Sequence, residues 1–128
     1  MTPLENKKET AIQFYKTAFE GNPEKAVHDY VGDDYFQHNP LVADGKQGFI
    51  DYFNRMQREY PDKSVRFLRA IAQDDLVALH KHQVWGAPDN KEYITMDFFR
   101  FDTKGKIVEH WDSIQEVIED TKSGRTMF

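Results

Sequence analysis

A few histidine and aspartate side chains are the groups in this sequence best suited to chemistry. They fall in three stretches: His80 and His82, then Asp97, then His110 and Asp112. Residues two apart point to the same face of a β-strand, so each spaced pair would share a face. If the three stretches are neighbouring strands, all five polar groups converge on one surface. Carboxylates and imidazoles held together in this way can act as general acids and bases.

Asp97 is the most informative of these groups. It lies in the run Tyr-Ile-Thr-Met-Asp-Phe-Phe-Arg-Phe, which favours a strand in which an aspartate is both disfavoured and costly to bury. One interpretation is an ion pair at the solvent face, with Arg100 or with a lysine of a neighbouring strand. The interpretation we favour is a functional carboxylate in an apolar pocket, where desolvation raises its pKa and makes it a better base.

The histidines allow other interpretations. His110 and Asp112 could be a structural pair that fixes their strand, and one of His80 and His82 could be a hydrogen-bonded wall residue. Together the four could also offer nitrogen and oxygen ligands to Zn²⁺, Fe²⁺ or Mn²⁺. Neither pair shows a metal-specific loop spacing. We therefore expect no metal and no organic cofactor.

The residues after Pro61 alternate with the period of two that strands show. The pattern predicts strands over residues 64–72, 76–85, 92–102 and 106–117, joined by short turns. Three of these strands have a face that mixes apolar and ionisable residues: Leu76, Ala78, His80, His82 and Val84; Tyr93, Thr95, Asp97, Phe99 and Phe101; Val108, His110, Asp112 and Ile114. If these faces form one concave surface roofed by helices, they enclose a small-molecule pocket.

The residues before Pro61 show helical spacing instead. Apolar positions predict a first helix over residues 4–19, a short second helix over residues 23–31, and a third that begins after Gly45 and stops before Pro61. Residues 33–40 are too irregular for either period, and we expect a turn or loop there. Helices followed by hairpin-linked strands indicate an α+β fold, with helices on one face of an antiparallel sheet.

The composition predicts a single domain over residues 1–128, with a polar tail at about 119–128. The chain has 17 basic and 22 acidic side chains, a net charge of −5 and no basic block, so we expect neither a nucleic acid nor a membrane as partner. The lack of cysteine excludes disulfide and thiol chemistry. Without a signal peptide or a membrane-length apolar run, we expect a soluble, cytoplasmic protein.

Five segments together resemble one family: residues 35–40, 80–82, 97–100, 105–112 and the ending 126–128. Their sequences are Tyr-Phe-Gln-His-Asn-Pro, His-Lys-His, Asp-Phe-Phe-Arg, Gly-Lys-Ile-Val-Glu-His-Trp-Asp and Thr-Met-Phe. In this order they resemble the SnoaL-like, polyketide-cyclase-like proteins of the nuclear transport factor 2-like superfamily. The most similar branch is described as predicted aldol-condensation-catalysing enzymes.

The resemblance implies a curved antiparallel sheet around a cone-shaped cavity closed by the three helices, and a homodimer formed through the outer face of the sheet. It also implies a cofactor-free site in which an aspartate on the third predicted strand is the general acid/base and a histidine on the preceding strand assists. Carried over by residue, these are Asp97 and His82. The expected substrate-binding residues are Tyr35, His38, Asn39, His80, Phe99, His110 and Asp112.

The sequence thus predicts a cofactor-independent acid/base enzyme acting on a small carbonyl-containing metabolite in an apolar pocket. The chemistry would be aldol-type cyclisation, lyase cleavage or isomerisation, each of which removes a proton next to a carbonyl group. Two alternatives stay open: a dimeric small-molecule-binding module without catalysis, and a protein with a His/Asp metal site. The terminal residues Thr126, Met127 and Phe128 could cover the pocket mouth or reach the dimer partner.

Overall fold

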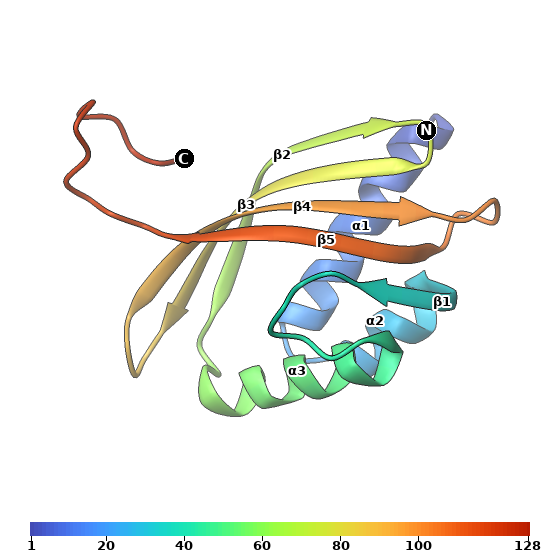
Figure 1. Ribbon diagram of the computed structural model, residues 1–128, viewed down its shortest axis with the longest axis horizontal. Helices are drawn as coiled ribbons and strands as arrows, with labels where there is room; N and C mark the ends of the chain where they lie inside the picture. The colour runs from blue at the N-terminus through green and yellow to red at the C-terminus, as the bar shows by residue number, and fades with distance from the viewer.

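The chain folds as a layer of helices against one curved sheet (Figure 1). The computed structural model describes all 128 residues, Met1–Phe128. The elements, in order, are α1 (Pro3–Phe19), α2 (Pro23–Tyr30), β1 (Val31–Gln37), α3 (Gly45–Glu59), β2 (Ser64–Gln73), β3 (Leu76–Gly86), β4 (Lys91–Phe101) and β5 (Ile107–Glu116). The strand order in the sheet is β1-β5-β4-β3-β2. The predicted α+β class, with three helices closing a curved sheet, is confirmed.

Local signals in the sequence set the helix ends. Thr2 caps α1 in a capping box, because its hydroxyl accepts the backbone N–H of Glu5 while the Glu5 carboxylate accepts the backbone N–H of Thr2. Asn22 caps α2 by accepting the backbone N–H of Lys25. None of the three helices is both long enough and apolar enough to cross a membrane.

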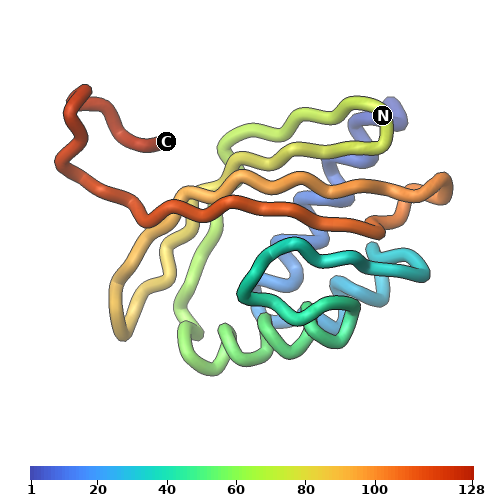
Figure 2. Tube along the Cα trace, viewed as in Figure 1, coloured from blue at the N-terminus to red at the C-terminus, as the bar shows by residue number.

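The edge strand β1 corrects the expectation of a turn or loop at residues 33–40. It pairs in parallel with β5, so the sheet is mixed rather than fully antiparallel (Figure 2). The strand is short, carries two aspartates and has an irregular register between Val31 and Phe36. These features suit a sheet edge, where charge discourages further strand pairing. They also weaken the two-residue period, which explains why the pattern did not predict a strand.

Strands β2 to β5 form consecutive antiparallel pairs, as predicted. Asp97 on β4 lies opposite Asp112 on β5, and Phe99 lies opposite His110. Directly opposed side chains project to the same side of a sheet, so all four lie on the concave side, beneath the helices. The faces predicted for the last two strands are correct except at the start of β5, where an irregular register puts Ile107, rather than Val108, opposite Phe101 and in the core.

The face predicted for β3 is wrong by one residue. The concave side of this strand carries Val77, Leu79, Lys81, Gln83 and Trp85, and Leu79 lies directly opposite Asp97. His80 and His82 therefore project from the outer side. Both alternating sets contain apolar and polar residues, so alternation along the strand could not decide which set was buried.

Aromatic side chains from three elements fill the space between helices and sheet. Phe14 of α1 stacks on Phe49 of α3 with ring centroids 4.8 Å apart, and meets Phe99 of β4 edge-on at 5.9 Å. These rings belong to one cluster of 16 buried residues. Aromatic rings prefer offset or edge-to-face contacts, which pack large surfaces at definite angles. Phe49 and Phe99 also form part of the wall of the cavity described below.

The loop between β1 and α3 is packed tightly against the start of the helix. A Cβ atom on Gly48 would lie 2.0 Å from the backbone oxygen of Ala43, so the approach requires glycine. Asp44 secures the loop by accepting the backbone N–H of Gln37 at 2.8 Å. The loop is thereby held over the concave side of β5, where it places Asn39.

The C-terminal tail, residues 117–128, leaves the end of β5 and curls back toward the sheet (Figure 1). The ring of Phe128 stacks on His82 at a centroid distance of 4.2 Å. Arg66 of β2 also contacts the Phe128 ring, with its guanidinium 5.2 Å from the ring centroid. The tail thus docks on the face away from the cavity and does not cover its mouth.

Candidate active site

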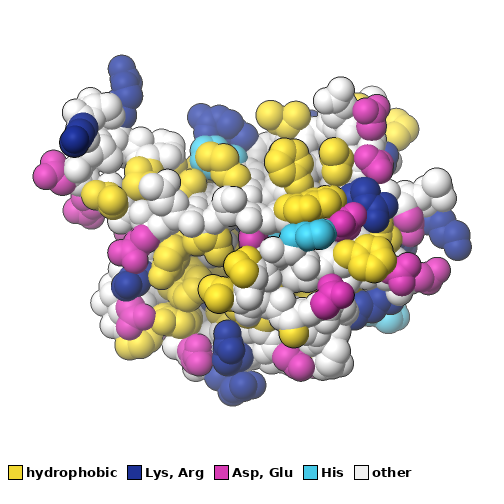
Figure 3. Space-filling view, viewed as in Figure 1, with side chains coloured by type: hydrophobic (Ala, Val, Ile, Leu, Met, Phe, Trp, Pro, Cys, Tyr) yellow, Lys and Arg dark blue, Asp and Glu magenta, His cyan; other side chains and the backbone are white.

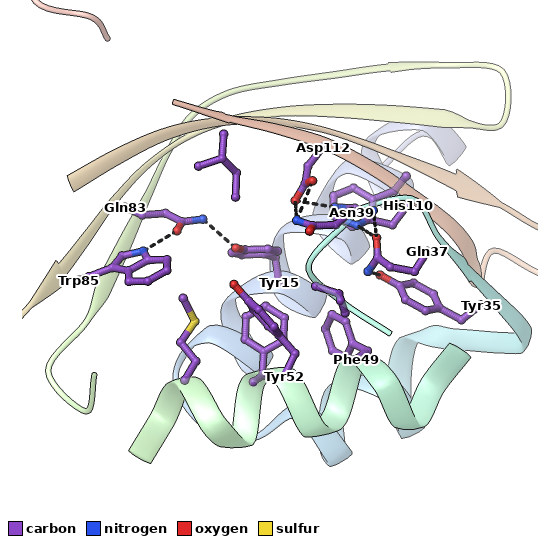
Figure 4. A pocket seen from close by; sticks show the side chains of 15 residues that line it. Tyr15, Tyr35, Gln37, Asn39, Phe49, Tyr52, Gln83, Trp85, His110 and Asp112 are labelled. Carbon is purple, nitrogen blue, oxygen red and sulfur yellow. Dashed lines mark hydrogen bonds and ion pairs between the residues drawn. The ribbon is translucent and has the colours of Figure 1, made fainter. Parts of the chain in front are cut away.

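A small cavity lies between the concave side of the sheet and helices α1 and α3 (Figure 4). Aromatic and other hydrophobic side chains form most of its wall, among them Tyr15, Phe49, Tyr52 and Phe99. Its volume is about 20 Å³, enough for about one water molecule. In the space-filling view, hydrophobic side chains surround a hollow between β5 and α3, where the cavity opens (Figure 3). A larger ligand must displace side chains at this mouth.

Asp97 and His110 form a buried pair in the cavity wall. Oδ1 of Asp97 is 2.7 Å from Nε2 of His110, and the two side chains are 0% and 7% exposed. His110 lines the cavity, whereas Asp97 lies behind it. Nε2 is also 3.9 Å from Oδ2 of Asp112. The structure therefore brings Asp97, His110 and Asp112 together, as the sorting of faces predicted.

Gln37 fixes the orientation of the His110 ring. Its Oε1 accepts the backbone N–H groups of His38 and Asn39, so this atom is an acceptor, and it lies 2.8 Å from Nδ1 of His110. Nδ1 must therefore carry a proton and donate it to Gln37. Because Nδ1 is committed to that bond, Nε2 is the nitrogen that faces the two carboxylates.

Asp112 is the carboxylate on the cavity side of this group. The amide nitrogen of Asn39 donates to its Oδ1 at 2.9 Å and lies 3.0 Å from its Oδ2. The side chain is 11% exposed and lines the cavity. Asn39 is itself anchored by its Oδ1, which accepts the backbone N–H of Leu41. Of the two aspartates, Asp112 is the one that a ligand in the cavity can touch.

Lys81 is the residue that the sequence analysis missed. Its side chain is fully buried, with Nζ 3.0 Å from Oδ2 of Asp97 and 2.8 Å from the ring centroid of Tyr15. The angles at this contact do not fit a hydrogen bond, so we describe the contact as an ion pair. The alternative prediction of an ion pair between Asp97 and a lysine of a neighbouring strand is therefore correct, but the pair is buried and does not lie at the solvent face. Arg100 instead binds Glu109 on the outer side.

The charges around Asp97 reverse the expected direction of its pKa. Burial alone would raise the pKa, but the Lys81 ammonium and the hydrogen bond from His110 outweigh it and leave the pKa of Asp97 below the ordinary value of 3.8. Burial lowers the pKa of Lys81 to about 8, against the opposing effect of Asp97. Asp97 is therefore an ionised partner rather than a carboxyl group poised to take a proton near neutral pH.

Two tyrosine hydroxyls face the cavity with their protons free. The amide nitrogen of Gln83 donates to the Tyr15 hydroxyl oxygen at 2.7 Å, and that of Gln37 to the Tyr35 hydroxyl oxygen at 3.4 Å. Trp85 orients Gln83 by donating its Nε1–H to Oε1 at 2.9 Å. Burial raises the pKa of both tyrosines well above 10.0, so both hydroxyls keep their protons at neutral pH. Each can donate a hydrogen bond to a ligand oxygen.

His80 and His82 lie outside this group, which corrects their expected place beside Asp97. His82 donates its Nε2–H to Glu92 at 2.7 Å and accepts from Arg66 at Nδ1, beneath the tail. His80 accepts from Arg69 on the outer side. The ring of His82 is buried by the tail rather than by the core.

His38 also points away from the cavity. Its ring stacks on Trp111 with centroids 4.9 Å apart, and its Nε2 is 2.7 Å from Oε2 of Glu109. Of the predicted substrate-binding residues, Tyr35, Asn39, Phe99, His110 and Asp112 line the cavity, whereas His38 and His80 do not.

The four side chains proposed as metal ligands do not come together, because His80 and His82 project from the opposite side of the sheet to His110. One nitrogen and two carboxylates remain within 4.8 Å of one another, from Asp97, His110 and Asp112. Both oxygens of Asp97 are already engaged, one by the Lys81 ammonium, whose charge would repel a cation. These residues do not fit a metal site.

The structure adds Lys81, Tyr15, Gln37 and Gln83 to the residues inferred from sequence. One signal for two of them was present: the set Val77, Leu79, Lys81, Gln83 and Trp85 alternates as regularly as the histidine set and ends in the larger apolar residue. Tyr15 lies on the predicted apolar face of the first helix, where an aromatic residue is ordinary core. Its contact with Lys81 depends on the tertiary packing.

Comparison with known proteins identifies one family. The family model of the SnoaL-like polyketide cyclases matches residues 9–118. Among solved structures, TsrD from Streptomyces laurentii is 18% identical, with a TM-score of 0.71 over 85% of this chain and 88% of its own. A candidate polyketide cyclase from Bacillus cereus is 17% identical, with a TM-score of 0.74 over 86% of this chain and 74% of its own.

A third structure, a candidate isomerase of the SnoaL-like family from Agrobacterium tumefaciens, is 16% identical, with a TM-score of 0.70 over 85% of this chain and 97% of its own. Identities this low show a shared fold. The search of curated protein sequences finds no match. The family model, by contrast, covers most of the chain, including the strands that carry Asp97, His110 and Asp112. The chain belongs to the SnoaL-like polyketide cyclase family.

Proposed function

We propose that this protein is a cofactor-independent acid/base catalyst of the cyclase or isomerase type that acts on a small carbonyl compound. The observation that carries the proposal is the buried Asp97–His110 pair, 2.7 Å apart, at the wall of an aromatic cavity that Asp112 also lines. Family membership supports the same class of chemistry. Aldol-type cyclisation, lyase cleavage and isomerisation all pass through an enolate, so the proposal concerns that shared step.

Asp112 is the group we propose as the base. It is the carboxylate that lines the cavity, whereas both oxygens of Asp97 are engaged by Lys81 and His110. Asp112 would remove the proton next to the substrate carbonyl and later return it. The Asp97–His110 pair would hold an N–H group beside Asp112, within 3.9 Å of its Oδ2. Asp97 would then take part in proton transfer through His110, without touching the substrate.

Two donors are placed to stabilise the enolate oxygen. The hydroxyl groups of Tyr15 and Tyr35 keep their protons and accept amide N–H groups, which leaves each O–H free to donate into the cavity. Preorganised donors aimed at developing negative charge contribute strongly where water is excluded. The aromatic walls of the cavity provide that exclusion and favour planar, apolar substrates.

The proposal is tested by hydrogen exchange at carbon. Acetylacetone and benzoylacetone, two small dicarbonyl compounds, are incubated in D₂O with the protein, and loss of the proton between the carbonyls is followed by NMR. We expect the protein to accelerate exchange, and Asp112→Asn to reduce the acceleration by about 100-fold or more. Asp97→Asn should reduce it less, because Asp97 acts through His110.

His82→Ala is the matched control, because it removes a histidine from the same sheet but from the outer side. We expect it to leave exchange unchanged. Full loss in His82→Ala with normal exchange in Asp112→Asn would contradict the proposed site. Binding of both compounds without any acceleration would instead support a binding module, a function that the aromatic cavity also allows once side chains at its mouth move.

We also propose that two copies associate through the outer face of the sheet. Ile71, Met96 and Phe98 on this face are 66%, 55% and 51% exposed. Exposed apolar side chains gathered on one surface mark interaction sites more often than isolated ones do. The cavity lies on the opposite side of the sheet, so such a dimer would leave its mouth open.

A further inference from the structure

Lys81 is a fully buried charged residue that takes no part in the proposed proton transfer. It lies on the concave side of β3, opposite Thr95, and is 0% exposed. Burying an ammonium group is costly, and an apolar residue of similar size would fill the same space at lower cost. The position of Lys81 therefore calls for a role that needs its charge.

That charge is directed at one atom. Nζ is 3.0 Å from Oδ2 of Asp97, and the hydroxyl of Thr95 reaches the same oxygen at 3.4 Å. On its other side Nζ faces the Tyr15 ring, which Gln83 holds in place through the phenol oxygen. Oδ2 is thus fully engaged, and only Oδ1 is left for His110.

Of the other groups around Asp97, only His110 also favours its ionised form. The groups that face it are Tyr15 from α1, Tyr35 from β1, Lys81 from β3, Thr95 on β4 itself, and His110 and Asp112 from β5. The tyrosines and Thr95 are neutral, and Asp112 is of like charge. Lys81 is the one lysine or arginine in contact with Asp97.

We propose that Lys81 is a positioning residue that keeps Asp97 ionised, so that Oδ1 of Asp97 holds a proton on Nε2 of His110. Gln37 already holds a proton on Nδ1. Both ring nitrogens then donate, and the ring beside Asp112 carries an N–H toward the carboxylates. The catalytic consequence rests on the proposed function, whereas the charge state of Asp97 does not.

The test is an NMR titration of the Asp97 carboxyl carbon and the His110 ring nitrogens. In the wild-type protein we expect Asp97 to stay ionised from pH 4 to 7. In Lys81→Met, burial should dominate and raise the midpoint of Asp97 by about one pH unit or more above 3.8. Lys91→Met is the control, because it removes a lysine from an exposed ion pair with Glu116 at 3.2 Å and should leave Asp97 unchanged.

The wild-type protein offers a second measurement that does not depend on the folding of a variant. The pKa of Lys81 is lowered to about 8, so its loss of charge should appear as an inflection in the Asp97 and His110 signals near that pH. Lys81→Arg, which keeps the charge, should keep Asp97 ionised. An unchanged Asp97 midpoint in folded Lys81→Met, or the absence of any inflection between pH 7 and 10, would overturn the role of Lys81.

The two proposals fail separately. If no dicarbonyl exchange is found but Asp97 shifts in Lys81→Met, the proposed function is overturned and the role of Lys81 in fixing the charge of Asp97 is supported. If exchange depends on Asp112 but Asp97 does not respond to Lys81, the reverse holds.

Discussion

The candidate site is built around a line of interior ionisable side chains, Lys81, Asp97 and His110, with Asp112 at the cavity end. Each contact constrains the next: the lysine occupies one oxygen of Asp97, and His110 occupies the other. Removing one partner of a buried ion pair leaves an uncompensated charge and typically costs about 3–5 kcal/mol. These side chains therefore link the stability of the protein to the protonation of its site.

Stability should fall on acidification because of Asp97. Its native pKa lies below 3.8, so the unfolded chain takes up the proton first, and the stabilisation present above pH 3.8 is lost as the pH falls through the lower native value. Asp97→Asn should lose about 3–5 kcal/mol at pH 7, because it leaves Lys81 unpaired, and should show a weaker pH dependence. Urea unfolding from pH 7 to pH 3 measures both effects.

The curves for the wild type and Asp97→Asn should approach each other as the pH falls. The control is Asp34→Asn, which changes an exposed aspartate of β1 and should keep the wild-type pH dependence. Parallel curves for the wild type and Asp97→Asn would contradict an ionised Asp97 in the native state.

At the scale of elements, two pieces of the chain decide what reaches the cavity. The alternation of β3 turns Lys81 and Gln83 inward and the neighbouring histidines outward. The loop between β1 and α3 carries Asn39 to Asp112, and its path depends on the close contact between Ala43 and Gly48. Neither effect is local, because each depends on which surface of the element another element covers.

Gly48→Ala tests the loop. An alanine in place of a helix glycine ordinarily stabilises by up to about 1 kcal/mol. Here the added Cβ would lie 2.0 Å from the backbone oxygen of Ala43, so the helix or the loop must move. We expect a net loss of about 1–3 kcal/mol in the free energy of unfolding.

Gln47→Ala is the neighbouring control on an exposed position and should change stability by about 0.5 kcal/mol or less. Chemical denaturation of the three proteins gives the comparison. A Gly48→Ala protein as stable as the wild type would show that the loop has another path available, and that Asn39 is not held by this contact.

At the scale of the whole molecule, helices cover the concave side of the sheet while its outer side stays open except where the tail docks (Figure 1). Phe98 lies opposite Trp111 on this open side. A homodimer would bury these side chains, and the tail would lie beside the interface because Phe128 packs on His82. Assembly and catalysis would then use opposite faces of one sheet.

Phe98→Glu should separate the proposed dimer into monomers. A charge at the centre of an apolar interface is left buried and unpaired, which opposes association. Light scattering after size-exclusion chromatography should give the mass of two chains for the wild type and one for the variant, with an unchanged circular dichroism spectrum. Leu41→Glu, at an apolar residue that is 77% exposed in the loop before α3, should remain dimeric. A monomeric wild type would refute the dimer.

Much of the fold followed from periodicity, because the period changes from helical to alternating at Pro61 and the turns between strands carry clear signals. The faces of β4 and β5 were predicted by assuming that their histidine and aspartates converge, although on both strands each alternating set mixes apolar and polar residues. The edge strand β1 was not predicted, since its aspartates and irregular register hide the alternation. The face of β3 was ambiguous, because both of its sets mix polar and apolar residues.

The sequence by itself determined the α+β class, the family resemblance and the convergence of Asp97, His110 and Asp112, because these depend on local period and on neighbouring strands. Only the tertiary structure decided that Lys81, rather than His82, meets Asp97, and that the pKa of Asp97 is lowered rather than raised. The physical reason is that a side chain's burial and charge environment depend on which distant elements cover it, and here α1 covers the lysine side of β3.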